Sequence, residues 1–151
     1  MTVKNLVLIA LSSVLLSACS GKTIYSDFQS VPITGWNADS VLTFSMNTAD
    51  LQGTYDVLLY VRHTDAYNYQ NMWLFVGANE WQQDTIEIYL ADDRGRWLSN
   101  GRTTMEMPVL YKENVRFTDS ICTLTIQQGM RSESLKGVLD IGVEIIQHGK
   151  E

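Results

Sequence analysis

The side chains that could carry catalysis are few in this chain and stand apart from one another. Nucleophilic catalysis requires a Ser, Thr or Cys beside a base that a third group orients. The sequence lacks the Gly-x-Ser-x-Gly motif that often marks such a nucleophile. His63 ends an apolar run and shares a face with Val57, Leu59 and Val61, so we expect a structural histidine. His148 is near the chain end, where we expect solvation. We therefore expect no enzymatic activity. A hydrolase would need His63 to meet a carboxylate and a hydroxyl in a cleft.

Thiol and metal chemistry are equally sparse. Cys122 alternates with Leu124 and Ile126, which predicts a small buried side chain whose thiol is inert. Two Cys and two His at scattered positions do not form the spacing of a zinc site, and we expect no metal or other cofactor. Asp92 and Asp93 are near Gly95, but the ligand spacing of a calcium loop is absent, so a hairpin turn explains them.

Cys19 is the exception, because its surroundings predict a covalent modification. Lys4 supplies a positive charge, and an apolar stretch from Leu6 to Leu16 follows it. This stretch is too short to span a membrane, which takes about 20 apolar residues. Leu16, Ser17, Ala18 and Cys19 match the bacterial lipobox. The sequence therefore predicts a signal peptide over residues 1–18, a Cys19 that carries diacylglyceryl and palmitate chains, and a tether over residues 19–24. An ordinary signal peptide that ends in Cys is the alternative.

The charge and the residue after the cysteine indicate where the protein acts. Eleven Lys and Arg against 17 Asp and Glu give a net charge of −6, which excludes a nucleic-acid binder that relies on phosphate contacts. Loss of Lys4 with the signal peptide leaves ten basic residues and a net charge of −7. Ser20 follows Cys19 where Asp would retain the protein in the inner membrane. We expect a lipid anchor in the outer membrane and a domain that faces the periplasm.

The elements that must position these residues are strands. Apolar and polar residues alternate over 41–47, 84–90, 120–128 and 137–146, as in half-buried strands. Residues 57–61 and 72–76 are continuously apolar, as in central strands covered on both faces. No segment shows a sustained helical period. These patterns predict an all-β fold, with residues 25–147 forming one antiparallel, jelly-roll-like β-sandwich.

Aromatic residues in or beside the predicted loops suggest a binding surface. Exposed rings on a β-sandwich can stack against sugar rings, so a carbohydrate-binding domain is one interpretation. The other interpretation places Trp36, Trp73 and Trp97 in the core, where each ring buries a large apolar area. The aromatic residues concerned are Trp36, Tyr67, Tyr69, Trp73, Trp81 and Trp97.

Several segments, in order along the chain, resemble one protein family. They are Gly35-Trp36-Asn37, Tyr111-Lys112-Glu113-Asn114-Val115-Arg116-Phe117, Ile126-Gln127-Gln128-Gly129-Met130-Arg131 and Asp140-Ile141-Gly142. Together with the lipobox, this series is similar to the GldH family, the gliding motility lipoproteins of Bacteroidota, over roughly residues 25–145. The second and third segments are its most specific parts.

The resemblance implies a non-enzymatic envelope lipoprotein that contributes to the gliding machinery and to its associated protein secretion. It supplies no catalytic residues. Its partners are expected to be the membrane, through Cys19, and other envelope proteins of gliding or secretion. Arg116 and Arg131 are polar enough to contact such partners. They could equally form weak ion pairs at the edge of a sheet.

Three tripeptides add a prediction of O-glycosylation. Bacteroidota attach glycans at Asp followed by Ser or Thr and then by a residue such as Val or Ile. Because Asp and Ser also favour turns before a strand, the motif and an ordinary strand start look alike. The three candidate hydroxyls belong to Ser40, Thr85 and Ser120.

Overall fold

A computed structural model describes residues 21–149, which form ten strands and no helix. None of these residues therefore belongs to a helix that could span a membrane. The strands are β1 (Thr23–Ser30), β2 (Trp36–Asn37), β3 (Val41–Asn47), β4 (Tyr55–His63), β5 (Asn71–Ala78), β6 (Trp81–Tyr89), β7 (Met105–Val115), β8 (Ile121–Gln128), β9 (Ser134–Leu135) and β10 (Val138–Gln147).

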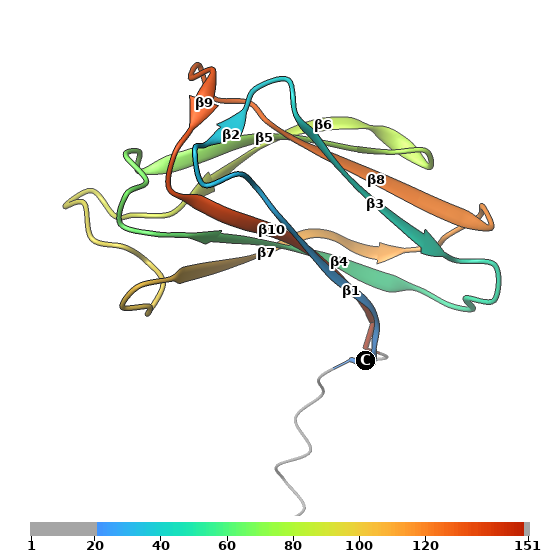
Figure 1. The fold of residues 1–151 in the computed structure, drawn as a ribbon. Helices are drawn as coiled ribbons and strands as arrows, with labels where there is room; N and C mark the ends of the chain where they lie inside the picture. Colours follow the sequence, from blue (N-terminus) through green and yellow to red (C-terminus); the bar gives the residue numbers. More distant parts are fainter. Residues whose placement is uncertain (1–20, 150–151) are drawn as a thin grey trace, which may run out of the picture.

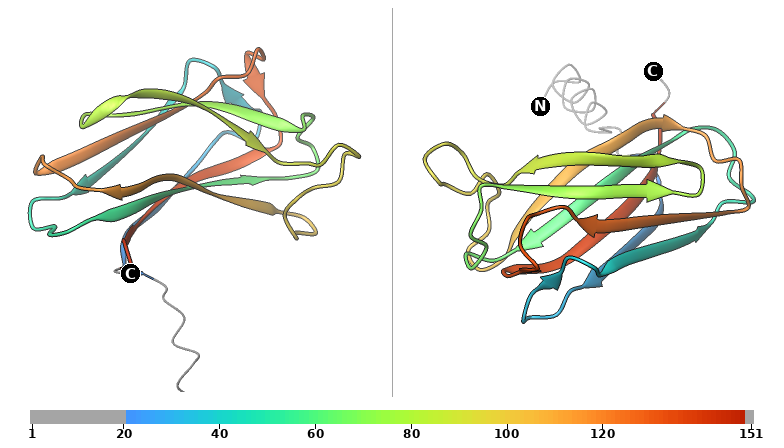
Figure 2. Two further views of the ribbon diagram at one scale, coloured as in Figure 1. Left: turned by 180° about the vertical axis from the view of Figure 1, so that it is seen from behind. Right: turned by 90° about the horizontal axis from the view of Figure 1, so that it is seen from above.

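The long strands form two antiparallel four-stranded sheets that pack face to face (Figures 1 and 2). One sheet has the order β1-β10-β4-β7 and the other has the order β3-β8-β5-β6, while β2 and β9 form a short separate pair. Apart from the β5-β6 hairpin, which lies within one sheet, the chain alternates between the two sheets in the manner of an eight-stranded jelly roll. The prediction of an all-β antiparallel sandwich is confirmed.

The core lies between the sheets and follows the alternation in the sequence. β4 shows it most regularly, since Val57, Leu59 and Val61 are fully buried while Leu58 and Tyr60 are half-buried on the outer face. β4 and β5 are interior strands, as their apolar runs predict. The expected cover on both faces is wrong, because Trp73 on the outer face of β5 is exposed and Leu58 and Tyr60 on that of β4 are only half-buried.

Two long strands escape the sequence patterns. β7 contains Pro108, which argues against a central strand, but β7 lies at a sheet edge, where the missing N–H is tolerated. β1 begins at Thr23, inside the segment that we expected to be tether, and pairs with β10 from Thr23 to Ser30. The alternation over 137–146 also predicts that Leu139 faces the core, but Leu139 is next to a bulge in β10 and is only half-buried.

The sandwich has two ends with different loops. The near end is where the described chain begins and ends, and there the N–H of Gln147 donates to the carbonyl oxygen of Lys22 at 2.9 Å. The far end lies at the opposite ends of the same strands, to the left in Figure 1. The near-end loops are residues 48–54, 79–80 and 116–120, and the far-end loops are residues 31–40, 64–70, 90–104 and 129–137.

Candidate functional site

A hollow at the far end collects three of the side chains that the sequence marks for contacts. It measures about 480 Å³ and opens beside the start of β5 and the turn after β8. Tyr69 and Trp73 expose 44% and 37% of their surface, and Arg131 is exposed beside them. Two aromatic rings and a guanidinium therefore meet at one place. The other lining residues are Asn71, Gly129 and Met130, whose types do not by themselves indicate a contact site.

The turn that carries Arg131 is held from below by a buried glutamine. The Gln128 side-chain amide nitrogen donates to the carbonyl oxygens of Trp36 and Ser132, at 3.4 and 2.8 Å. Its Oε1 accepts the backbone N–H of Met130 at 2.8 Å. Both ends of a buried amide are thus satisfied, which favours this one conformation of the turn over others.

Close backbone contacts join this turn to β5. The Gly129 N–H donates to the Trp73 carbonyl oxygen at 2.7 Å, and the Trp73 N–H donates to the Met130 sulfur at 3.3 Å. A Cβ at position 129 would lie only 3.2 Å from the ring of Phe75. Gly129 therefore allows the turn to lie directly against the strand, and this contact forms the floor of the hollow.

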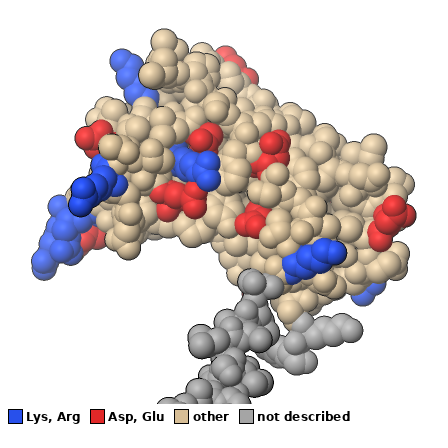
Figure 3. Space-filling model, turned by 60° about the horizontal axis from the view of Figure 1, so that its bottom comes forward, with Lys and Arg blue, Asp and Glu red and all other residues tan. Residues whose placement is uncertain are grey.

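Arg131 is free of ion pairs within residues 21–149. By contrast, Arg62 lies 2.5 Å from Glu106, and Arg96 lies 2.8 Å from Asp92. Arg62 belongs to the outer face of the β1-β10-β4-β7 sheet, where acidic side chains are spread among basic ones (Figure 3). The Arg131 guanidinium therefore keeps its hydrogen-bond donors available beside two exposed rings.

Two of the predicted contact residues belong to the core instead. Trp36 is fully buried, and its Nε1–H donates to the carbonyl oxygen of Ser40 at 3.0 Å. Tyr67 is also buried, and its hydroxyl donates to the carbonyl oxygen of Asn71 at 2.7 Å. Neither ring can reach a partner in this structure. The core interpretation therefore holds for Trp36 and is wrong for the exposed Trp73, and Tyr67 is a further core residue. The polar atom of each buried ring therefore donates a hydrogen bond to a backbone carbonyl oxygen at the far end.

Trp97 is half-buried and covers the histidine that catalysis would have required. His63 is fully buried, its ring centroid lies 4.6 Å from that of Trp97, and its Nδ1 lies 3.1 Å from the carbonyl oxygen of Thr64. Its Nε2 is buried without a hydrogen-bond partner. Burial lowers the pKa of His63. No carboxylate or hydroxyl in the described part of the chain hydrogen-bonds to this ring, so it has the surroundings of a structural histidine.

The other titratable groups also have structural surroundings. Cys122 is fully buried, and its burial raises the pKa of the thiol to about 12. The Asp92 carboxylate accepts the backbone N–H groups of Arg94 and Arg96, which closes a turn. His148, expected to be solvated, instead lies 2.6 Å from a carboxylate oxygen of Asp56. Residues 21–149 contain no group of three or more His, Cys, Asp or Glu that could hold a metal ion.

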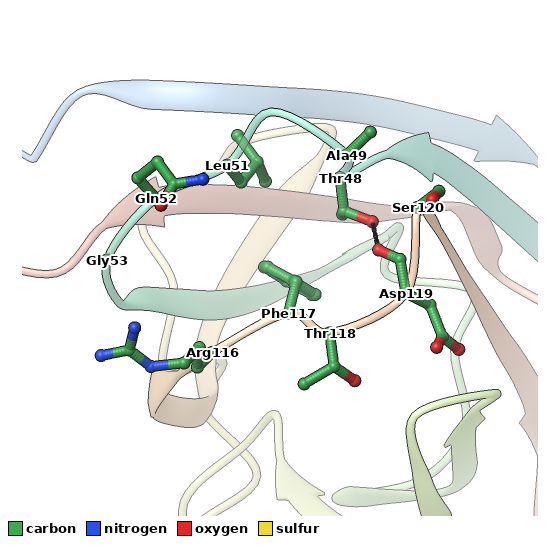
Figure 4. A pocket seen from close by; sticks show the side chains of 10 residues that line it. All are labelled: Thr48, Ala49, Leu51, Gln52, Gly53, Arg116, Phe117, Thr118, Asp119 and Ser120. Carbon is green, nitrogen blue, oxygen red and sulfur yellow. Dashed lines mark hydrogen bonds between the residues drawn. The ribbon is translucent and has the colours of Figure 1, made fainter.

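Arg116 lies at the near end, far from Arg131. It lines a polar hollow of about 260 Å³ with Phe117 and Asp119, and it extends away from Asp119 (Figure 4). The Thr48 hydroxyl donates to the carbonyl oxygen of Asp119 at 2.6 Å, which ties the two near-end loops together. Arg116 is exposed and forms no ion pair within residues 21–149, but no exposed ring accompanies it.

Comparison with known protein families matches residues 23–145 to the family described as GldH lipoprotein. This chain belongs to the GldH lipoprotein family. It is 30% identical to the gliding motility lipoprotein GldH of Flavobacterium johnsoniae, over 97% of this chain and 99% of that protein. It is also 30% identical to a gliding motility lipoprotein GldH homolog of Christiangramia forsetii, over 87% of this chain and 88% of that protein.

Solved structures of other proteins match this chain only at low similarity. A family GH115 4-O-methyl-α-glucuronidase is 12% identical with a TM-score of 0.47, covering 87% of this chain and 18% of its own. An exo-β-1,3-galactanase from Phanerochaete chrysosporium is 13% identical with a TM-score of 0.44, covering 85% of this chain and 30% of its own. At these similarities, neither enzyme's activity bears on this GldH protein.

The two motifs most specific to the GldH resemblance have separate structural roles. In the first, the Tyr111 hydroxyl and the Lys112 ammonium contact one carboxylate oxygen of Asp84 at 2.7 and 3.0 Å, which joins β7 to β6 across the open side of the sandwich. Asn114 forms a bulge with a φ of 56°, and its N–H donates to Asp56. The second motif contains the buried Gln128 and ends on the exposed Arg131.

The remaining predicted positions are the modification sites. Ser40, Thr85 and Ser120 are all exposed, so each hydroxyl is accessible. Cys19 and the expected signal peptide lie outside the described residues. The anchor and the glycans therefore stay predictions.

Proposed function

We propose that this GldH protein is a non-enzymatic lipoprotein of the cell envelope that contributes to gliding motility and its associated protein secretion through protein–protein contacts. The main support is its relation, over nearly the full length of both chains, to two proteins named as gliding motility lipoproteins. The absence of a hydrogen-bonded catalytic group around His63, within the described residues, agrees with a binding role.

In this proposal Cys19 carries the lipid anchor, in the outer membrane with the domain facing the periplasm. Two residues span at most about 7 Å, so Cys19 would be close to Gly21 and to the near end of the sandwich. Diacylglyceryl and palmitate chains on one cysteine hold a protein firmly at a membrane. Mass spectrometry of the mature N-terminus should find acylated Cys19. A free Cys19, or an intact Lys4 segment in the envelope fraction, would contradict this part of the proposal.

The far end would then point away from the membrane and present the hollow of Tyr69, Trp73 and Arg131 to partners. Deleting the gene should reduce spreading and secretion, and the wild-type gene should restore both. Crosslinking in intact cells should yield products with envelope proteins of the same machinery. Normal spreading and secretion in the deletion strain would remove the proposed function.

A second candidate is a carbohydrate-binding lipoprotein, which the exposed rings of Tyr69 and Trp73 favour. In a glycan array, such a protein should bind a saccharide, and the substitution Trp73→Ala should abolish that binding. Leu110→Ala is a matched control, because Leu110 is exposed on the other sheet. An array without any binding above background would exclude this candidate.

We also propose O-glycosylation of at least one of Ser40, Thr85 and Ser120, which are exposed hydroxyls in Asp-Ser or Asp-Thr tripeptides. A glycan needs such an accessible surface position. The intact mass of the protein from its own cells should exceed that of the lipidated polypeptide, and a triple Ala variant should lose the excess. A mass equal to the lipidated polypeptide alone would end this proposal.

A further inference from the structure

The composition of the far-end hollow indicates what it binds. Protein interfaces are enriched in Trp, Tyr, Met and Arg, while Lys, Asp, Glu, Ser and Ala are depleted there. The hollow presents Tyr69, Trp73, Met130 and Arg131, and none of its lining residues belongs to a depleted type. Three of these types, Tyr, Trp and Arg, also dominate the binding energy at many interfaces when they cluster.

We propose that this hollow is the docking site for a segment of a partner protein that carries a carboxylate beside an apolar or aromatic side chain. The proposal rests on the protein-contact function proposed above and names the chemistry of the partner. The apolar or aromatic side chain would pack against the exposed rings of Tyr69 and Trp73. The carboxylate would accept two N–H bonds from the Arg131 guanidinium, the geometry that arginine favours.

Charge complementarity supports a carboxylate at this place. The far-end loops contain five Asp or Glu and five Lys or Arg. The rest of the described chain contains eleven Asp or Glu and only four Lys or Arg. An acidic segment is therefore repelled by most of the domain and least by the far end. There it meets Arg131, which has no ion pair within residues 21–149.

The hollow is also ordered before a partner arrives. Gln128 holds the turn through its buried amide, and Gly129 and Met130 both hydrogen-bond to the backbone of Trp73. Fixing the backbone of the turn before Arg131 in advance lowers the entropy that binding must remove. The hollow also faces away from Gly21, so an anchor at Cys19 would leave it open to proteins of the envelope.

A peptide selection tests the proposal. The full-length acylated protein, purified in detergent, is used to select from a random peptide library displayed on phage. We expect enrichment of peptides in which Asp or Glu lies beside an aromatic or large apolar residue. A synthetic peptide from this pool should bind about 30-fold more weakly to Trp73→Ala and to Arg131→Glu. Arg131→Lys should weaken binding less than Arg131→Glu, because the ammonium keeps the positive charge. It should still weaken binding, because lysine lacks the paired N–H donors of the guanidinium.

Matched controls separate the hollow from the rest of the surface. Arg102→Glu changes the charge of another far-end loop outside the hollow, and Leu110→Ala removes an exposed side chain from the opposite sheet. Neither should change the affinity of the peptide. Replacing the peptide carboxylate by its amide should weaken binding to the wild type and should have no further effect on Arg131→Glu.

Three results would overturn the proposal. The first is a selection that yields no peptide whose binding depends on Trp73 and Arg131. The second is a pool of such peptides that contains no Asp or Glu. The third is glycan binding that requires Trp73, when no peptide binding requires it. The proposed function has a separate test, because it fails when the deletion strain spreads and secretes normally. If the deletion strain is defective and Arg131→Glu restores it fully, only the docking site is refuted.

Discussion

At both ends of the sandwich, a side chain hydrogen-bonds to the backbone of a loop, but the two ends expose different side chains to solvent. At the near end, the Glu80 carboxylate accepts the backbone N–H groups of Thr118 and Asp119 at 3.0 and 2.7 Å, so side chains close the loops on one another. At the far end, Gln128 closes its turn in the same way but leaves Arg131 pointing outward. Both ends thus expose an arginine, Arg116 at the near end and Arg131 at the far end, but only the far end places it beside two exposed rings.

This difference suggests a division of labour within the domain. The near end adjoins the start of the described chain and needs only to remain folded. The far end must remain folded and must also present a surface. It therefore combines buried aromatic residues, Trp36 and Tyr67, with exposed ones, Tyr69 and Trp73. Substitutions that separate stability from binding test this interpretation.

The largest expected effect comes from the buried ring beneath the far end. Trp36→Ala should lower the free energy of unfolding by about 3 to 5 kcal/mol, because it leaves a cavity in the core. Trp73→Ala, at the partly exposed ring, should lower it by less, about 1 to 2 kcal/mol, because solvent already reaches that side chain. Chemical denaturation of the two variants measures the difference. Equal losses in both would contradict the separation of core and surface rings.

A smaller loss is expected from the buried amide. Gln128→Ala should reduce the free energy of unfolding by about 2 to 3 kcal/mol, since it leaves buried backbone groups without partners. Glu80→Ala removes the corresponding near-end contact on a more exposed residue and should cost about 1 kcal/mol. Peptide binding should fall only in Gln128→Ala, because only that turn carries Arg131. A binding loss in Glu80→Ala would show that the ends are coupled.

The fold followed from the sequence wherever burial imposes alternation. β3 and β8 were predicted within one residue of their bounds, because each buries one face. β7 was missed because its Pro108 argues against a strand unless the strand is known to lie at an edge. β1 was missed because its place depends on pairing with β10, more than 100 residues away. Such pairing leaves no local pattern in the sequence.

The candidate site was predictable in part. Residue type alone marked Tyr69, Trp73 and Arg131, but it also marked Trp36 and Tyr67, which are buried. An aromatic residue beside a turn can face inward or outward, and only the packing decides. The roles of Gly129 and Met130 depend on contacts with Trp73, which is distant in sequence. Their place in the motif that ends at Arg131 was the one available signal.

A dependence on pH is expected from the far end. Burial lowers the pKa of His63, so the folded protein takes up this proton at a lower pH than the unfolded chain does. The stability contributed by neutral His63 is complete above about pH 6.5. It declines as the pH falls from there to the folded pKa. Denaturation at a series of pH values should show this decline, and His63→Leu should remove it.

Asp84 provides the control for this pH dependence. The Tyr111 hydroxyl and the Lys112 ammonium hold the pKa of the Asp84 carboxyl below its ordinary value of 3.8. Its contribution is therefore present above that value and is lost only at lower pH. Asp84→Asn should leave the decline near pH 6 unchanged while reducing the loss of stability in stronger acid. A decline near pH 6 that persists in His63→Leu would assign it to another group.

The smallest effect on stability is expected from the two exposed arginines, one at each end. Arg116 and Arg131 form no ion pair within residues 21–149, so Arg116→Glu and Arg131→Glu should each change the free energy of unfolding by less than about 0.5 kcal/mol. Their effects on binding should differ, because only Arg131 lies beside Tyr69 and Trp73. In a deletion strain with defective spreading, Arg116→Glu should restore spreading and Arg131→Glu should not, at equal protein levels. Equal restoration by both would show that the far end has no special role in contacts. Failure of Arg116→Glu alone would place the contact surface at the near end.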